Sequence, residues 1–190
     1  MIDITVFAAM ALLLIGYAAV LYSVLRRAQR RLTRAWCHLD FAWDRRDGDL
    51  VKLLDLCRQD DPCDSELIER VLRARQTLQE ARQRRDVSAV NDMENALRRT
   101  LASMYPAASR QRQGHAQAVV RALRFRIQAH EQAIAAARAR YNEAASALNS
   151  RIEMLPETLI AGLCGVTPAA LLQCETTTQA DIGLGLAFSK

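Results

Sequence analysis

The chain has 190 residues, 51% of them hydrophobic and 25% charged, and a formal net charge of +5. This length fits one folded domain with enough apolar residues to bury a core. It contains only seven Gly and four Pro, and no run of alternating Val, Ile and Thr. The composition therefore excludes a sheet-rich protein and predicts an all-α fold.

The first element in chain order is an apolar segment. Residues 4–25 read ITVFAAMALLLIGYAAVLYSVL and carry no charge, and a helix of roughly 20 such residues is long enough to cross a bilayer. A cleaved signal peptide would have a basic start, but MIDIT carries Asp3 and no Lys or Arg. We therefore expect a retained transmembrane anchor over residues 1–25.

A basic stretch without acidic residues follows the anchor. Its arginines are Arg26, Arg27, Arg30, Arg31 and Arg34. The positive-inside rule then predicts that the N-terminus lies outside and that all later residues lie in the cytoplasm. We expect these arginines to contact anionic lipid headgroups, at about 1 kcal/mol each before screening.

The cysteines agree with a reducing compartment. The chain has five of them, an odd number, with no disulfide-like framework. We expect them to serve as small apolar packing residues. The spacing of Cys57 and Cys63 matches no zinc module, so no metal or other cofactor is expected.

Helical periodicity continues beyond the anchor. A first stripe predicts one helix from the membrane to about residue 58, and Pro62 interrupts it. The first stripe consists of Leu32, Trp36, Leu39, Trp43, Arg46, Leu50, Leu53 and Cys57. A second helix begins after Asp64 or Ser65. The pattern from Val87 to Met104 is either a third helix or a continuation of the second, and Asp86 is the only indication of a separate start.

The longest stripe follows. It runs from Val120 to Leu155 for about five heptads, through His130 and Tyr141. Such a stripe must be covered, and the first helix is its only partner of comparable length. The sequence therefore predicts a transmembrane helix continuing into an elongated antiparallel, up-and-down bundle over residues 26–175. Pro156 ends the long helix, a short apolar helix stops at Gly165, and residues 176–190 are expected to be disordered.

Two stretches resemble a known family. AWCHLDFAWDRR, and RYNEAASALN followed by a proline and LIAGLCGVTP, are similar to the motifs of the LemA family. The matching residues that we take as structural or interaction candidates are Trp36, Asp40, Arg45, Arg46, Tyr141, Asn142, Asn149, Pro156 and Gly165. The resemblance covers about residues 4–175. It implies a single-pass protein of the bacterial inner membrane with a cytoplasmic helical bundle, and it implies no activity.

One departure from the family pattern concerns the first helix. Where the family has D-L-I-P-N-L, this chain reads GDLVKL. The proline expected near Val51 is absent, so we expect the helix to continue there without a kink.

Three carboxylates share a helix face and raise the question of chemistry. Asp40, Asp44 and Asp47 are spaced at i, i+4 and i+7, close enough to hold a cation or share a proton. The favoured interpretation is that they neutralise arginines within or across helices. His130 is interpreted as a hydrogen-bonded core residue or a register-setting polar contact rather than a proton sensor. No nucleophile, base or metal set is recognisable, so we expect no enzymatic activity.

A second basic group lies on the second helix. Its arginines are Arg70, Arg73, Arg75, Arg82, Arg84 and Arg85. Acidic residues are interleaved and no aromatic side chain is available for base stacking, which favours a solvated helix face over a nucleic-acid surface. No nucleic-acid partner is expected.

Two functions remain compatible with this sequence. The first is a membrane-tethered interaction or scaffold protein that presents a groove or helical face to an unknown protein partner or to a second copy. The second is a regulated helper of a membrane assembly or stress process, in which opening of the bundle exposes the apolar seam.

Overall fold

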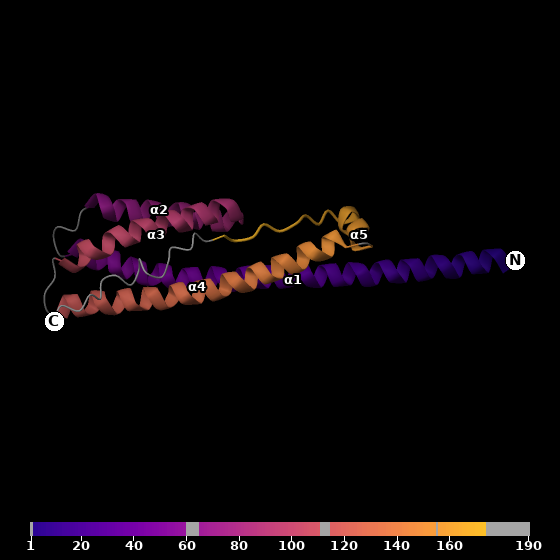
Figure 1. Cartoon of the computed structure of the whole chain (residues 1–190), viewed down its shortest axis with the longest axis horizontal. Helices are drawn as coiled ribbons and strands as arrows, with labels where there is room; N and C mark the ends of the chain where they lie inside the picture. Colours follow the sequence, from indigo (N-terminus) through magenta and orange to yellow (C-terminus); the bar gives the residue numbers. More distant parts are fainter. Residues whose placement is uncertain (1, 60–64, 111–114, 155, 174–190) are drawn as a thin grey trace. The chain divides into compact units, whose positions relative to one another are not determined.

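A computed structural model describes residues 2–59, 65–110, 115–154 and 156–173, with the side chains of 2–4, 59, 105–110 and 115–116 excepted. The described residues are all-α, as predicted, and contain no strand. They form α1 (Ile2–Gln59), α2 (Ser65–Arg84), α3 (Val87–Arg110), α4 (His115–Glu153) and α5 (Glu157–Leu163) (Figure 1). The predicted disorder of residues 176–190 falls outside the described part of the chain.

α1 begins as an exposed apolar helix. Within the described residues it is the one helix long and apolar enough to cross a membrane, although a signal sequence would meet the same criterion. Few residues of its apolar window are buried, so this part is no core helix of the fold. The same helix passes through Val51 without interruption, as the missing proline predicts. The sequence thus supports membrane anchoring at the level of length and composition.

The chain divides into two compact units, and α1 and α4 contribute to both. The first unit comprises Met1–Leu39 and Ala136–Leu171, and the second comprises Asp40–Ala135 and Leu172–Lys190. In the first unit, α1 and α4 run antiparallel, and α5 closes a small apolar cluster against them. That cluster consists of Leu25, Ala28, Leu148 and Ala161, with Leu32, Ile152, Val166 and Ala169 at its edge.

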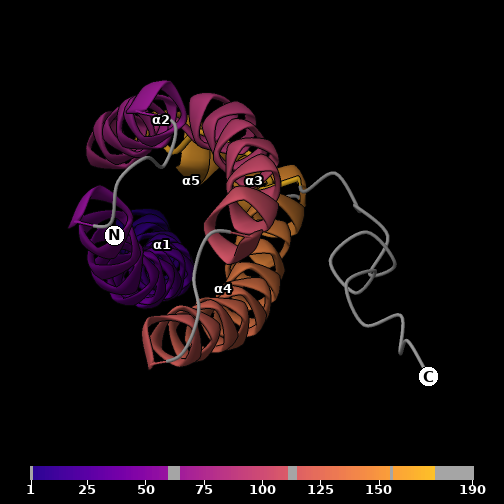
Figure 2. The same cartoon turned by 90° about the vertical axis from the view of Figure 1, so that its left-hand side faces the viewer.

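The second unit is a four-helix arrangement made of α2, α3 and the adjoining parts of α1 and α4. The end-on view shows the four helices arranged in a ring (Figure 2). Trp43, Leu78, Leu97 and Ile127, one from each helix, are fully buried and represent its core. The alternation of directions around the ring is the up-and-down order that the sequence predicts for short connections.

The structure settles the open question about the second and third helices, which are separate. Arg85 adopts a left-handed φ of 54°, which ends α2. The backbone N–H of Asp86 donates to the Ala81 carbonyl at 3.1 Å. Its side chain accepts a hydrogen bond from the N–H of Ala89 at 3.1 Å and so caps α3.

The end of α4 and the stop of α5 also follow the sequence. α4 ends at Glu153, Pro156 is the residue before α5, and Gly165 has a φ of +65° after it. The N–H of Val166 donates to the Ala161 carbonyl at 3.0 Å, which closes the helix end in the manner of a glycine cap. A side chain at position 165 would be strained by this φ whatever space surrounds it.

The packing interpretation of the cysteines is wrong for two of them. Cys57 is buried in the second unit, but Cys37 and Cys164 are exposed because they lie off the apolar stripes. Cys63 and Cys174 are outside the described residues.

Candidate functional site

A buried guanidinium lies at the centre of the second unit. Arg46 is 0% exposed and donates to Glu94 of α3 through two nitrogens, one of them 3.0 Å from Oε2. It also donates to Oε1 of Glu131 on α4 at 2.8 Å, and Arg98 donates to Oε2 of the same carboxylate at 2.8 Å. One arginine of the apolar stripe therefore joins α1 to α3 and α4.

The charge of Arg46 is fixed by its partners. Burial alone would lower the pKa of Arg46, but the carboxylates of Glu94 and Glu131 more than offset this and raise the pKa above its ordinary value. Arg46 is thus permanently charged, and its role is structural pairing rather than proton exchange.

A second guanidinium joins α2 to α1. Arg82 donates to Oδ1 of Asp40 at 2.7 Å and to Oδ1 of Asp44 at 2.5 Å, and it lies 3.4 Å from Oδ2 of Asp47. It also lies over the ring of Trp43, 5.2 Å from the centroid. The three acidic residues that share a helix face therefore meet at one arginine.

The placement of Arg82 corrects one prediction. The solvated helix face predicted for the arginines of α2 is wrong for Arg82, which is buried, and for Arg75, which is half-buried against Asp47. Alternating charges along a helix indicate exposure only where no neighbouring helix supplies counter-charges, and here the aspartates of α1 replace water around the guanidinium. Arg70, Arg73, Arg84 and Arg85 are exposed, as that interpretation requires.

Asp47 is the acidic member of this cluster with the least contact with solvent. Burial raises the pKa of Asp47 above its ordinary value, although Arg46, Arg82 and Arg75 act to lower it. Arg75 Nε lies 3.6 Å from its Oδ2. The ionised form of Asp47 is therefore less favoured in the folded protein than in water.

A third polar cluster joins α1 to α4. The buried carboxylate of Asp49 lies 3.0 Å from the guanidinium of Arg126 and 3.4 Å from Nζ of Lys52. Its other oxygen is 3.1 Å from Nε2 of His130. His130 is thus the hydrogen-bonded residue that the sequence favours.

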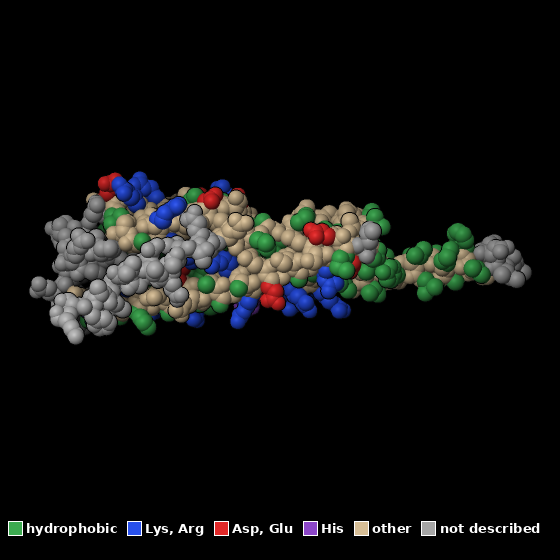
Figure 3. All heavy atoms as spheres, in the orientation of Figure 1, with side chains coloured by type: hydrophobic (Ala, Val, Ile, Leu, Met, Phe, Trp, Pro, Cys, Tyr) green, Lys and Arg blue, Asp and Glu red, His purple; other side chains and the backbone are tan. Residues whose placement is uncertain are grey.

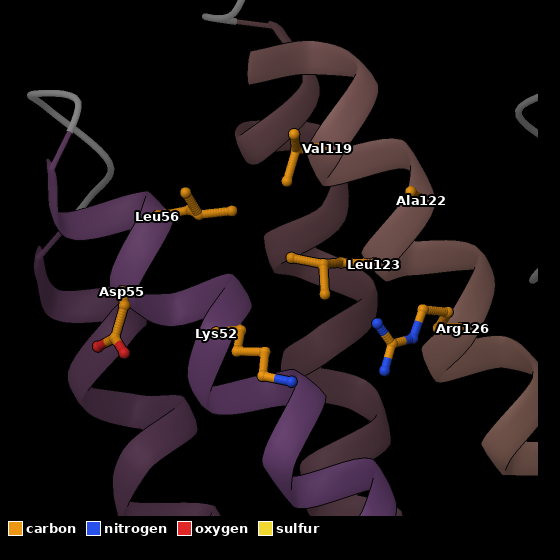
Figure 4. A pocket seen from close by; sticks show the side chains of 7 residues that line it. All are labelled: Lys52, Asp55, Leu56, Val119, Ala122, Leu123 and Arg126. Carbon is orange, nitrogen blue, oxygen red and sulfur yellow. The ribbon is translucent and has the colours of Figure 1, made fainter. Parts of the chain in front are cut away.

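An open groove of about 450 Å³ lies next to this cluster. Its lining residues are Lys52, Asp55, Leu56, Val119, Ala122, Leu123 and Arg126. Figure 4 shows Leu56, Val119 and Leu123 in the space between α1 and α4, with Lys52 and Arg126 extending toward one another. The groove thus combines an apolar floor with a charged rim.

The first unit holds an extended segment by side-chain hydrogen bonds. The amide of Asn149 donates to the carbonyl of Ala169 at 2.9 Å and accepts from the N–H of Ala169 at 2.8 Å. The hydroxyl of Tyr141 donates to the carbonyl of Ala170 at 3.1 Å, and its ring packs edge to face on Trp36 at 5.5 Å. We call this arrangement of Tyr141 and Asn149 the clasp.

The other predicted residues have simpler surroundings. The arginines expected at the lipid interface are all exposed: Arg26, Arg27, Arg30, Arg31 and Arg34. Arg45 is exposed and stacks over Phe41 at 4.8 Å, and Asn142 is half-buried. Pro156 precedes α5 and Gly165 follows it, so both mark boundaries of local structure.

The sequence alone did not predict several acidic residues of the ion-pair network. Glu94 lies on the steps of four and three that connect Val90, Leu97 and Leu101, a position usually occupied by an apolar residue. Arg46 likewise occupies a stripe position on α1. A charged residue in an apolar stripe is the signal that could have identified Glu94. Asp49 and the pairing role of Glu131 carried no comparable signal.

The described side chains of this site pair mainly with one another. Among the described residues, no three His, Cys, Asp or Glu side chains gather as a metal site would require. The chemistry that the arrangement supports is ion pairing between helices and hydrogen bonding to an extended chain.

Comparison with known proteins identifies a family. Residues 35–183 match the LemA family, which leaves the apolar start of α1 outside the matched range. No curated protein and no solved structure gives a match. Because the matched range covers most of the chain, including the ion-pair network and the clasp, this protein belongs to the LemA family.

Proposed function

We propose that this protein is a membrane-anchored interaction module that acts by binding and performs no catalysis. The observation that carries the proposal is the continuity of α1. The same helix begins with exposed apolar residues such as Phe7, Leu13 and Ile15 and ends among the ion pairs of the second unit. One uninterrupted helix thus connects the anchor to the bundle. A partner-binding surface on the bundle would therefore be tethered to the membrane.

The orientation forms part of the proposal. The five arginines after the anchor are exposed, so headgroups can reach them, and Arg26 also donates to the hydroxyl of Tyr22 at 2.8 Å. Under the positive-inside rule they hold the bundle in the cytoplasm, with the N-terminus outside, in a bacterial inner membrane. The partner is a protein or a second copy of this chain.

Topology provides the first test. In cells, we expect the bundle to be protected from protease added outside and to be digested in inverted membrane vesicles. Replacing the five arginines by Gln should give mixed orientations, whereas the same replacement of the exposed Arg70, Arg73 and Arg84 of α2 and of Arg85 after it should not. A chain recovered from the medium without its apolar segment would refute the anchor.

Partner binding provides the second test. The groove of the second unit has an apolar floor that a partner side chain can cover. Cross-linking in native membranes, followed by mass spectrometry, should yield a defined adduct that Ala122→Trp in the groove removes. Ala133→Trp, at an exposed site on α4 outside the groove, is the matched control and should retain the adduct.

The same experiment separates the two functional classes. Adducts present under ordinary growth support the interaction module. Adducts that appear only after envelope stress support the alternative, a regulated helper whose bundle opens. If neither condition yields an adduct that depends on the groove, binding at this surface is refuted.

A further inference from the structure

The short helix α5 lies beside the point where the apolar segment of α1 ends. Ala161 of α5 is buried against Leu25, Ala28 and Leu148. Leu25 is the last residue of the uncharged segment, and Arg26 follows it. At about 1.5 Å of rise per residue, Ala28 is only about 5 Å beyond Leu25 along the helix axis.

This position corresponds to the interfacial layer of a bilayer. The hydrocarbon core is about 30 Å thick and the whole bilayer about 40–45 Å, so each headgroup layer spans roughly 5–8 Å. If the segment ending at Leu25 crosses the core, α5 lies at the depth of the headgroups. The contacts that place it there all belong to the first unit.

The outer face of α5 is apolar. Leu159 is 65% exposed and Leu163 is 85% exposed. They are four residues apart and share one face, about half a turn around the helix from the buried Ala161. Met154, just before α5, is also exposed. A face turned to water would ordinarily carry polar residues at these positions.

The charges around α5 fit a lipid surface. Arg26, Arg27, Arg30 and Arg31 are exposed on the adjoining turns of α1. Glu157 is largely buried and lies 3.8 Å from Arg151, while Glu153 and Thr158 are exposed polar residues nearby. Figure 3 shows hydrophobic side chains gathered where the N-terminal part of α1 emerges, with basic side chains close by.

We propose that α5 is an interfacial foot, whose Leu159 and Leu163 insert into the bilayer on the side where the bundle lies. This inference rests on the proposed function, because it requires the start of α1 to span the membrane. The foot would prevent α1 from rotating or tilting freely about its anchor. The clasp supports it, since Asn149 and Tyr141 hold the segment that follows α5.

The chain's own cysteines allow a direct depth measurement. Cys164 is exposed directly after Leu163, whereas Cys37 is exposed on α1 nine residues beyond Ala28. Full-length chains that retain only one of these cysteines are labelled with a nitroxide and reconstituted into vesicles of phosphatidylcholine and phosphatidylglycerol. Collision of the label with oxygen and with a water-soluble nickel complex then reports its depth.

We expect the label on Cys164 to favour oxygen and the label on Cys37 to favour nickel. Leu159→Gln together with Leu163→Gln should move the Cys164 label into water without changing the Cys37 label. Both leucines are exposed, so this double variant should fold, and an unchanged circular dichroism spectrum would verify this.

A third label separates this inference from the proposed function. A chain with Leu13→Cys as its single cysteine should show an oxygen-favoured label if the anchor spans the bilayer. An embedded label at 13 with an aqueous label at 164 would overturn the foot and leave the anchor intact. An aqueous label at 13 would overturn the anchor itself. Spin–spin broadening between the Cys164 labels of two copies would show that α5 contacts a second chain instead of lipid. This result would also overturn the foot.

Discussion

The two units are built from the same pair of long helices but are held together by different physics. In the first unit, α1 meets α4 through apolar contacts around Leu148 and through the ring of Trp36 on Tyr141. In the second unit, the same helices are joined by Arg46 to Glu131 and by Asp49 to His130. The change occurs along continuous helices, without any break in either of them.

The difference between the two units concerns the register of their helices. Two apolar stripes with a repeat of three and four can slide by one heptad at modest cost, whereas a buried arginine must meet its carboxylates. The ion pairs of the second unit join all four helices, and a shift of one helix by a heptad would separate them. In the first unit, the clasp holds the segment after α5 through hydrogen bonds to Ala169 and Ala170.

The largest effect on stability is expected from a substitution that removes the buried charge at the centre of the second unit. Arg46→Ala should lower the free energy of unfolding by about 3–5 kcal/mol, because it leaves the buried Glu94 without its main partner. Urea unfolding of the full chain in detergent micelles, followed by circular dichroism, measures this loss. Arg45→Ala is the matched control, and as an exposed residue stacked on Phe41 it should cost less than about 1 kcal/mol.

The comparison also predicts how Arg46→Ala can be rescued. Arg46→Met combined with Glu94→Met should recover most of the stability, since the double variant removes the buried carboxylate that would lose its partner, and Glu131 keeps its ion pair with Arg98. Hydrogen exchange should increase in α2 and α3 of the single variant more than in residues 136–171. Equal loosening of both units would contradict the division into two differently held parts.

The next effect removes the aromatic contact of the first unit. Trp36→Ala should cost about 3 kcal/mol, because it removes a buried ring and leaves a cavity beside Tyr141. The same urea experiment applies, and here the faster exchange should appear in residues 136–171. Trp36→Phe is the control and should retain most of the stability, as it preserves an edge-to-face pair.

The sequence predicted the apolar framework better than the polar one. Leu39, Trp43 and Leu50 lie on the expected stripe and are buried. In α4, Tyr141 lies on the expected stripe and is buried, and Ala145 beside the stripe is buried as well. Periodicity succeeds here because burial of apolar area dominates the packing of long helices and depends little on which helix is opposite.

The polar framework depends on partners far apart in sequence. Arg82 lies 42 residues from Asp40 in the sequence, and no local sequence pattern on α2 predicts that the two residues pair. The clasp shows the same limit in another form. The resemblance identified Tyr141 and Asn149 as candidates, but only the folded chain shows that they bind the backbone of Ala169 and Ala170. Such contacts carry no periodicity that a single sequence could reveal.

A smaller effect should release the clasp. Asn149→Ala removes two hydrogen bonds to Ala169, which corresponds to about 2 kcal/mol at about 1 kcal/mol each. Its effect should be local, so the amides of residues 166–172 should exchange faster and a protease should cut there first. Ser150→Ala, at the exposed neighbouring position, should leave both unchanged. Equally slow exchange in the Asn149 variant would mean that packing alone holds this segment.

The smallest effect concerns pH and distinguishes Asp47 from the exposed acids around it. Because burial raises the pKa of Asp47 above its ordinary 3.8, the folded protein binds a proton at this site more tightly than the unfolded chain does. Its contribution to stability is therefore full below pH 3.8 and is lost as the pH rises through the folded pKa. Asn does not titrate, so the Asp47→Asn variant does not lose this contribution. The free energy of unfolding of the variant, relative to that of wild type, should therefore increase as the pH rises from acidic to neutral. Urea unfolding across this range measures the difference, and a decrease would show that Arg82 and Arg75 outweigh burial at this carboxylate.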